Sequence, residues 1–131
     1  MDKDELKKKL NETEFHVTQE KGTEAPYSGE YWKTNDAGMY ACKICGQKLF
    51  ASDTKLNSAE GPLGLRGWPA FDDAIAGSVE YVEDNTMGMH RTEVVCSKCK
   101  SHLGYLFDDE HAPSGKHFCV NSCSIDFEKK E

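Results

Sequence analysis

The sequence predicts a mainly β domain with a helical segment in front of it. Two observations support this fold class. From Tyr31 onward the chain contains short segments rich in aromatic and β-branched residues, which are typical of strands. Two Cys-x-x-Cys pairs each follow one such segment and precede another. A chain of 131 residues fits a single domain, so we expect these segments to share one core.

The net charge of −7 restricts the classes of partner. Nucleic-acid binding depends mainly on Lys and Arg, so we expect no nucleic-acid partner. No apolar run approaches the roughly 20 residues of a membrane span, and the charged residues 1–5 lack the apolar core of a secretory signal. We therefore expect a cytoplasmic protein without a membrane partner.

The first 28 residues are polar and contain one helical signal. Leu6 and Leu10 lie four residues apart, with acidic residues before them and lysines between them. This spacing predicts a short amphipathic helix, with its acids at the favourable N-terminal end and with Asn11 ending it. The run from Pro26 to Gly29 then predicts a loop.

Strands are predicted over most of the rest of the chain. The glycine-rich residues 57–67 predict a surface loop, and residues 71–75 predict one helical turn. The predicted strands are residues 39–41, 47–50, 79–82, 92–95, 103–107 and 116–127. Together they favour a mainly antiparallel β domain.

The two Cys-x-x-Cys pairs predict a metal site. Six cysteines in a chain expected to be cytoplasmic favour metal binding or redox chemistry over structural disulfides. Cys42 with Cys45, and Cys96 with Cys99, can each place two sulfurs on one ion, and together they complete a tetrahedral site that suits one zinc ion. Four protein ligands leave no open position, so we expect this zinc to be structural. The alternatives are two redox Cys-x-x-Cys pairs or four buried free thiols.

The two remaining cysteines lie in one strand-like segment. In an extended strand, alternation puts His117, Cys119, Asn121 and Cys123 on one face. A nearby imidazolium or hydrogen-bond donor favours a thiolate, so Cys119 is the candidate for a reactive thiol. The alternative is a small buried hydrophobic residue, which is the commoner role of a single cysteine in a β segment.

The motifs follow a specific order along residues 29–127. They are residues 38–42, the first Cys-x-x-Cys pair with Leu49 and Phe50, residues 67–71, 91–96, 101–107 and 113–115, and residues 119–122. Each motif alone would be weak, but their joint order resembles the methionine sulfoxide reductase B family. We therefore assign residues 1–28 to a helical lead-in and residues 29–131 to a catalytic domain similar to that family.

The resemblance implies two antiparallel sheets that form a zinc-stapled, barrel-like domain with short N-terminal helices. It also implies reduction of the R epimer of methionine sulfoxide in proteins or peptides, with thioredoxin or a similar thiol as reductant. In this family the residue at Cys119 attacks the sulfoxide sulfur and becomes a sulfenic acid. Trp68 matches the pocket tryptophan of the family, and Asn121 matches a residue that orients the site. We expect a monomer.

The chain departs from the family pattern beside the nucleophile. Tyr105 replaces the second histidine of the usual His-Leu-Gly-His segment, and His117 replaces an arginine two residues before the nucleophile. Both usual residues support acid catalysis or thiolate formation, so proton delivery falls to His102, Tyr105 or His117. Position favours Tyr105, whereas acidity favours a histidine.

The loop before Gly67 lacks the cysteine that many relatives use to resolve the sulfenic acid. Cys123 is then the remaining thiol outside the metal site. In an extended strand, residues four apart are separated by roughly 13 Å. A disulfide needs Cα atoms within about 7 Å. We therefore predict that Cys119 works without a fast internal partner. The alternative is that Cys123 is a second redox thiol.

A second class of function stays open. The same scaffold with two Cys-x-x-Cys turns could serve a non-catalytic zinc-binding chaperone or interaction module. Such a module would not need Cys119, Trp68 and Asn121 at the family positions. A zinc-ribbon nucleic-acid binder is a third class, and the charge of −7 disfavours it.

Overall fold

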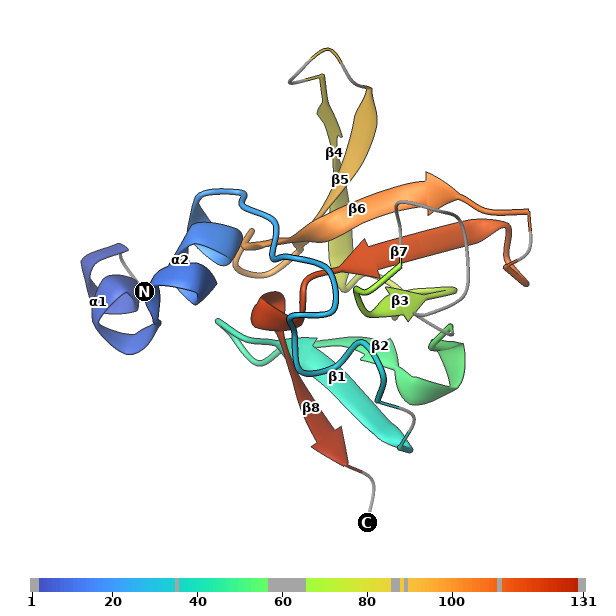
Figure 1. Ribbon diagram of the computed structural model, residues 1–131, viewed down its shortest axis with the longest axis horizontal. Helices are drawn as coiled ribbons and strands as arrows, with labels where there is room; N and C mark the ends of the chain where they lie inside the picture. The colour runs from blue at the N-terminus through green and yellow to red at the C-terminus, as the bar shows by residue number, and fades with distance from the viewer. Residues whose placement is uncertain are drawn as a thin grey trace.

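Two helices precede eight strands in the computed structural model, which describes residues 3–34, 36–56, 66–85, 88, 90–110 and 112–129. Figure 1 shows the helices, α1 (Lys3–Lys9) and α2 (Glu12–Gln19), to one side of the strands. No helix in these ranges is long and apolar enough to cross a membrane. The strands are β1 (Gly38–Cys42), β2 (Lys48–Ala51), β3 (Ala70–Phe71), β4 (Val79–Asp84), β5 (Arg91–Cys96), β6 (His102–Asp108), β7 (Lys116–Val120) and β8 (Ile125–Lys129).

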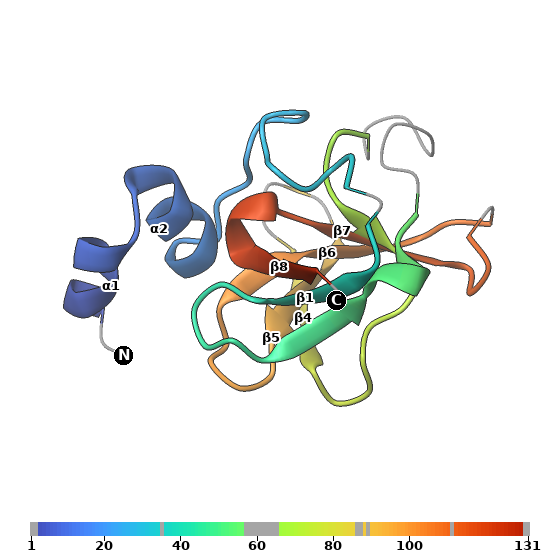
Figure 2. The same ribbon diagram turned by 90° about the horizontal axis from the view of Figure 1, so that it is seen from below.

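The strands form two antiparallel sheets, which lie against each other in Figures 1 and 2. One sheet has three strands in the order β2-β1-β8, and the other has five in the order β3-β7-β6-β5-β4. The prediction of a mainly β fold with two antiparallel sheets and short N-terminal helices is confirmed. Over the described ranges each sheet keeps two edge strands, so the topology is not that of a closed barrel.

Aromatic residues from both sheets fill the core between them. Phe50 of β2 stacks on Phe71 of β3 with ring centroids 4.4 Å apart, and its centroid lies 5.8 Å from that of Phe118 of β7. Tyr40 of β1 meets Phe71 at 5.0 Å. Phe118 therefore faces the core, and strand alternation turns its neighbour Cys119 to the opposite face of the five-stranded sheet.

The predicted single strand over residues 116–127 is wrong, because the chain changes sheets within it. β7 ends at Val120 in the five-stranded sheet. A one-turn 3₁₀ helix follows at Ser122–Ser124, and β8 begins at Ile125 in the three-stranded sheet. This segment therefore links the two sheets instead of extending one of them.

Asn121 marks the point where the chain turns. Its backbone N–H donates to the carbonyl oxygen of Leu103 at 2.9 Å, and its own carbonyl accepts from the N–H of Ser124 at 3.0 Å. Cys123 consequently lies in the 3₁₀ helix and does not share a strand face with Cys119. The separation calculated for an extended strand does not apply to these two cysteines.

Asn11 caps a second helix as well as following the first. Its side chain accepts a hydrogen bond from the backbone N–H of Glu14 at 2.8 Å, and the Glu14 side chain accepts from the N–H of Asn11 at 3.0 Å. This reciprocal capping starts α2, which buries Phe15 and Val17. The residue predicted to end a helix is thus mainly a signal for the start of the next one.

The predicted helical turn over residues 71–75 is wrong. Ala70 and Phe71 instead form β3, whose backbone pairs with Cys119 and Phe118 of β7. Strand pairing places these residues beside the candidate nucleophile. Most of the predicted loop over residues 57–67 lies outside the described residues, and its last two residues form part of a turn.

Candidate active site and metal centre

The two Cys-x-x-Cys pairs meet in space. Cys42 ends β1 and Cys96 ends β5, and the turns that follow these strands carry Cys45 and Cys99. The four sulfur atoms all lie within 4.8 Å of one another. The predicted sharing of one site by two distant turns is therefore confirmed, as a cluster that can hold a metal ion.

Both turns use the same backbone geometry. The N–H of Gly46 donates to the carbonyl oxygen of Cys42 at 2.9 Å, and the N–H of Lys100 donates to that of Cys96 at 2.8 Å. Each donor residue has a positive φ, 80° for Gly46 and 63° for Lys100. Glycine adopts this conformation without strain, whereas lysine does not. The second turn is therefore the more strained of the two.

The sulfur spacing fits a tetrahedral ion. Cys42 Sγ lies 3.6 Å from Cys99 Sγ, and Cys45 Sγ lies 3.5 Å from Cys96 Sγ. Four sulfurs at roughly 2.3 Å from a zinc ion would be roughly 3.8 Å apart, so only a small movement is needed. The hydrogen bond from the Cys42 thiol lowers the pKa of Cys99 to about 4 and raises the pKa of Cys42. The cluster thus already favours one of the thiolates that a metal ion requires.

Cys119 lies on the face of the five-stranded sheet that points away from the core. It pairs directly with Tyr105 of β6 on one side and with Ala70 of β3 on the other. Side chains directly opposite in antiparallel strands have Cβ atoms roughly 5 Å apart, so Tyr105 is a close neighbour of the thiol. A Cβ atom at Gly104 would clash with the carbonyl oxygen of Cys119, so the close approach of β6 and β7 here requires glycine.

A cavity of about 110 Å³ opens at Cys119. Its volume suits the end of one side chain, since sites for whole drug-sized ligands are typically about 300 Å³ or more. Trp68 is half-buried, and its Nε1–H donates to the carbonyl oxygen of Glu24 at 2.9 Å, which holds the indole in place. The residues that line the cavity include Trp68, Arg91, Tyr105, Phe107, Cys119 and Asn121.

The Cys119 thiol keeps its proton at neutral pH. Burial raises the pKa of this thiol to about 12, and the negative charge of Glu24 adds to the effect. His117 does not line the cavity, and its Nδ1 pairs instead with Asp109 Oδ2 at 3.2 Å. This environment therefore stabilises the protonated thiol of Cys119. The sequence had led us to expect an environment that stabilises its thiolate.

The second histidine, His102, also does not line the cavity. His102 Nδ1 pairs with Glu93 Oε2 at 2.8 Å, and its side chain is 3% exposed. Burial lowers the pKa of His102 although Glu93 opposes this effect, so the ring is neutral near pH 7. Among the described residues, the Nε2 atoms of both His102 and His117 are buried without a hydrogen-bond partner.

Tyr105 contacts a network of two buried carboxylates and one exposed lysine. The Tyr105 hydroxyl donates to Asp84 Oδ2 at 3.1 Å. Lys21 Nζ bridges two carboxylates, at 3.1 Å from Asp84 and 3.3 Å from Glu93. Burial opposes the charge of Lys21, but the hydrogen bonds to both carboxylates outweigh it and raise the pKa of the amine. Tyr105 and His102 therefore belong to one connected network.

Residues 10–129 match the family model of the SelR domain. The chain belongs to the SelR domain family. Its relatives include "Methionine-R-sulfoxide reductase B3, mitochondrial" from Mus musculus, with 48% identity over 124 residues. That match covers 94% of this chain and 47% of the mouse protein, so the chain spans about half of that relative's length.

Microbial members of the SelR family match over nearly their whole length. "Peptide methionine sulfoxide reductase MsrB" from Methanosarcina barkeri is 46% identical over 129 residues, covering 98% of this chain and 87% of that protein. The protein of the same name from Acinetobacter baumannii is 42% identical over 128 residues, covering 97% and 88%. These relatives confirm the resemblance to the methionine sulfoxide reductase B family.

One solved structure shares the fold of this SelR domain at low sequence identity. It is the crystal structure of the Mis18 "Yippee-like" domain, with a TM-score of 0.55 and 14% identity. The match covers 72% of this chain and 98% of that one. At this identity the likeness concerns the fold alone.

The SelR site also uses residues 21–24, which the sequence motifs did not reveal. The backbone N–H of Glu24 donates to Asn121 Oδ1 at 3.0 Å, and its carboxylate Oε1 accepts from the N–H of Cys123 at 2.9 Å. Thr23 lines the cavity at Cys119. Glu24 is only 4% exposed, although it lies in a polar stretch of sequence. Nothing in its spacing distinguishes it from a solvated acid, so sequence reasoning had no signal for it.

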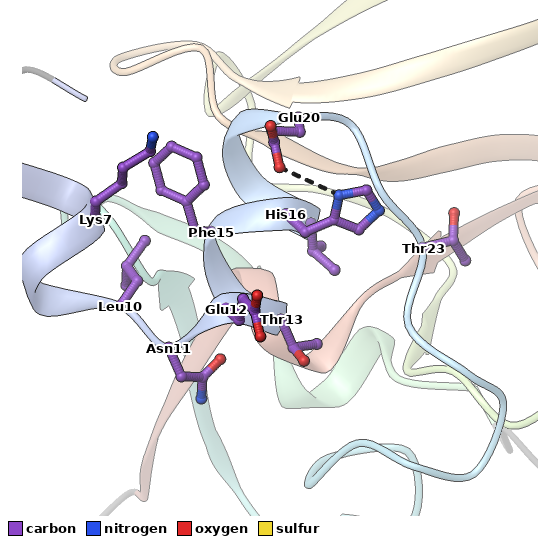
Figure 3. Close-up of a pocket in the computed structure, with 10 residues that line it drawn as sticks. Lys7, Leu10, Asn11, Glu12, Thr13, Phe15, His16, Glu20 and Thr23 are labelled. Atoms are coloured by element: carbon purple, nitrogen blue, oxygen red, sulfur yellow. Dashed lines mark hydrogen bonds and ion pairs between the residues drawn. The ribbon is translucent and has the colours of Figure 1, made fainter. Parts of the chain in front are cut away.

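A larger cavity of about 720 Å³ lies along the N-terminal helices. Figure 3 shows Leu10, Phe15 and His16 on its wall, with His16 Nδ1 3.4 Å from Glu20 Oε1. Its lining contains no cysteine and none of the predicted site residues. The larger cavity therefore lacks the reactive groups. We take the smaller cavity as the candidate active site because it contains the Cys119 thiol.

Proposed function

We propose that this SelR protein reduces the R epimer of methionine sulfoxide in proteins or peptides, with Cys119 as the nucleophile. The relatives that carry the name of this activity support the proposal. The observation that carries it is the position of Cys119 at a cavity of about 110 Å³, opposite Tyr105 and beside Trp68. A thiol in a small cavity with aromatic side chains on its wall suits a substrate that presents one methyl-bearing sulfur.

Each part of the substrate has a counterpart in the cavity. The aromatic faces of Trp68 and Phe107 provide an apolar wall for the S-methyl group, and sulfur itself contacts aromatic rings favourably. The hydrogen bond from Trp68 to the Glu24 carbonyl fixes this wall. Asn121 donates through Nδ2 to the carbonyl oxygen of Leu103 at 3.1 Å, so its role is to hold the end of β7 in register.

The proposed reaction moves one oxygen atom between two sulfurs. Cys119 attacks the sulfoxide sulfur, the substrate S–O bond breaks, and the oxygen ends on Cys119 as a sulfenic acid. The substrate is reduced by two electrons to methionine, and the thiol is oxidised by two. Cys119 loses the proton on its sulfur, and the sulfenic acid has one proton on its oxygen. The site must therefore transfer one proton from the Cys119 sulfur to the oxygen.

We assign this proton transfer to Tyr105. Tyr105 lines the cavity and pairs directly with Cys119, whereas His102 and His117 do not line the cavity. Burial raises the pKa of Tyr105, Asp84 adds to this effect, and Arg91 opposes it. The hydroxyl is therefore protonated near neutral pH. It can give that proton to the sulfoxide oxygen and accept the thiol proton in its place.

The metal at the four-cysteine cluster is proposed to be a single structural zinc ion. Four thiolates suit zinc and leave no open position for substrate. Cys42 ends β1 of the three-stranded sheet and Cys45 follows it, while Cys96 ends β5 of the five-stranded sheet and Cys99 follows it. The ion would thus tie the two sheets together at one end.

Return of the sulfenic acid to a thiol requires an external reductant, which we propose is thioredoxin or a similar thiol. Cys123 lines a different cavity, of about 510 Å³, from the one at Cys119. This separation supports the prediction that Cys123 is not a fast internal partner. The protein is proposed to act as a cytoplasmic monomer.

The proposal is tested by the Cys119→Ser variant, assayed for release of methionine with dithiothreitol as reductant. We expect turnover of the R epimer to fall to background, because a hydroxyl is far less ionised and less nucleophilic than a thiol. Thermal unfolding is expected to stay near that of the native protein, with Cys123→Ser as the matched control. Near-native turnover by Cys119→Ser, or a preference for the S epimer, would contradict the proposal.

The same assay separates the enzyme from a non-catalytic module. If the native protein binds metal, folds and yet reduces neither epimer, the interaction-module reading replaces the enzyme. Metal content and circular dichroism measured on the same sample make that outcome unambiguous.

A further inference from the structure

One cation borders the cavity at Cys119. Among the described residues that line this cavity, Arg91 of β5 alone carries a positive charge. Its Cζ lies 4.0 Å from the centroid of the Tyr105 ring, and its Nη2 lies 3.5 Å from Asp84 Oδ2. These contacts hold the guanidinium beside the residue that pairs with Cys119.

Arg91 keeps a hydrogen-bond donor that is not used. Its Nε is buried and has no partner within the described part of the chain. Buried donors are usually paired, and leaving one unpaired is unfavourable. The side chain as a whole is 24% exposed and lines the cavity. A ligand oxygen that reached the guanidinium there would give this donor an acceptor.

Three other donors on the cavity wall already make hydrogen bonds. The Tyr105 hydroxyl, which is the proposed proton donor, donates to a carboxylate at 3.1 Å before substrate binds and carries no positive charge. Trp68 Nε1 and Asn121 Nδ2 donate to backbone carbonyl oxygens at 2.9 Å and 3.1 Å. Arg91 is therefore the charged group best placed to meet an incoming oxygen.

We propose that Arg91 binds the oxygen of the sulfoxide and thereby selects oxidised over reduced methionine. This inference rests on the proposed function. A sulfoxide oxygen carries partial negative charge and accepts charge-assisted hydrogen bonds, whereas a thioether sulfur is a weak acceptor. Arginine stays protonated, so Arg91 supplies charge and hydrogen bonds while the proton comes from Tyr105. Once the oxygen has moved to Cys119, the product methionine lacks this contact and leaves more readily.

The test measures binding on a Cys119→Ser background, which leaves the substrate intact. Two peptides of one sequence, with either methionine (R)-sulfoxide or methionine, are titrated by calorimetry. Arg91→Gln is expected to weaken the sulfoxide peptide roughly tenfold to a hundredfold, as for loss of a charged hydrogen bond, and to change the methionine peptide by less than about twofold. Arg91→Lys keeps the charge without the planar fork and should recover part of the loss.

Lys48→Gln is the matched control, because it removes one positive charge from an exposed residue of the other sheet. We expect it to change neither affinity. Equal losses for both peptides, or no loss for either, in a folded Arg91→Gln protein would overturn the role of Arg91. If Arg91→Gln does not fold, the affinities of Arg91→Lys for the two peptides are compared in the same way. If instead the parent binds both peptides equally and the native protein reduces neither epimer, the proposed function fails.

Discussion

Cysteine side chains have different roles in the four-cysteine cluster and in the cavity at Cys119. In the cluster, the two ligands of each turn are three residues apart, so local spacing almost defines the site. In the cavity, the wall comes from β5, β6 and β7, from Asn121, and from Thr23 and Trp68 far apart in the sequence. A site made of two local turns can be predicted from spacing, whereas a composite site depends on how the whole chain folds.

The two regions also differ in how they treat the thiol proton. In the cluster, a hydrogen bond from Cys42 lowers the pKa of Cys99 to about 4. At the cavity, burial raises the pKa of Cys119 to about 12. The cluster therefore favours one thiolate, at Cys99, while the cavity keeps the Cys119 thiol protonated. The loss of a cysteine should damage the fold in one region and the chemistry in the other.

The largest effect on folding is expected from Cys45→Ser. An incomplete ligand set weakens metal binding, and that binding energy is folding energy. We expect the free energy of unfolding to fall by on the order of 4 kcal/mol or more, because loss of a metal site is among the most severe mechanisms. Denaturant unfolding and metal analysis measure this effect, with Cys123→Ser as the control outside the cluster. Well-folded native protein that contains no zinc would refute the assignment of the metal.

Tyr105→Phe should act mainly on the chemistry, with a smaller loss of stability because the buried Asp84 carboxylate loses a hydrogen bond. Removing the hydroxyl takes away the proposed proton donor while keeping the ring beneath Arg91, so the single-turnover rate should fall roughly a hundredfold or more. His102 does not line the cavity, so His102→Ala should slow the chemical step less than Tyr105→Phe does. An unchanged chemical step in Tyr105→Phe would reduce this residue to a packing role.

The pH dependence of Cys119 gives a smaller but direct contrast with the cluster. Its pKa is raised from the ordinary 9.0 to about 12, so folding favours the protonated thiol. This contribution to stability is fully present below about pH 9 and is lost as pH rises towards 12. We expect alkylation of Cys119 to accelerate about tenfold per pH unit between about pH 7 and 9. A plateau within that range would reveal a stabilised thiolate.

The smallest effect is expected from Cys123→Ser. Cys123 lines a separate cavity, and burial raises the pKa of its thiol to about 12, so it is a poor attacking group. Turnover with thioredoxin should stay near the native rate. After one equivalent of sulfoxide without reductant, peptide mass mapping should find Cys119 sulfenic acid. A rapid and stoichiometric Cys119–Cys123 disulfide would show that the turn at Ser122–Ser124 lets the two sulfurs meet.

Local patterns predicted the parts of the molecule that depend on local physics. The segments that became β1, β2, β4, β5 and β6 carry β-branched and aromatic residues between turn signals, and each is a strand. The Cys-x-x-Cys spacing predicted the cluster. The family resemblance supplied Trp68, Tyr105 and Asn121, and all three line the cavity at Cys119.

The features that sequence reasoning missed depend on distant contacts. No glycine or proline separates β7 from β8, so the sequence contains no local signal for the break between them. The break coincides with hydrogen bonds of Asn121 to Leu103 on another strand. Lys21 and Glu24 look like solvated charges in a polar segment, yet each is paired with a distant part of the chain. The partners of a buried charge come from the tertiary fold, which spacing along the chain does not report.

Residues 21–24 set a practical limit on how the protein can be shortened or fused to a reporter. Helix α1 packs mainly on α2, so a deletion that stops before Asn11 leaves the cap of α2 and everything after it in place. A deletion to residue 28, where the polar lead-in stops, would remove Lys21 from Asp84 and Glu24 from Trp68. The shortest working version of this enzyme should therefore retain part of the segment that looks least important in its sequence.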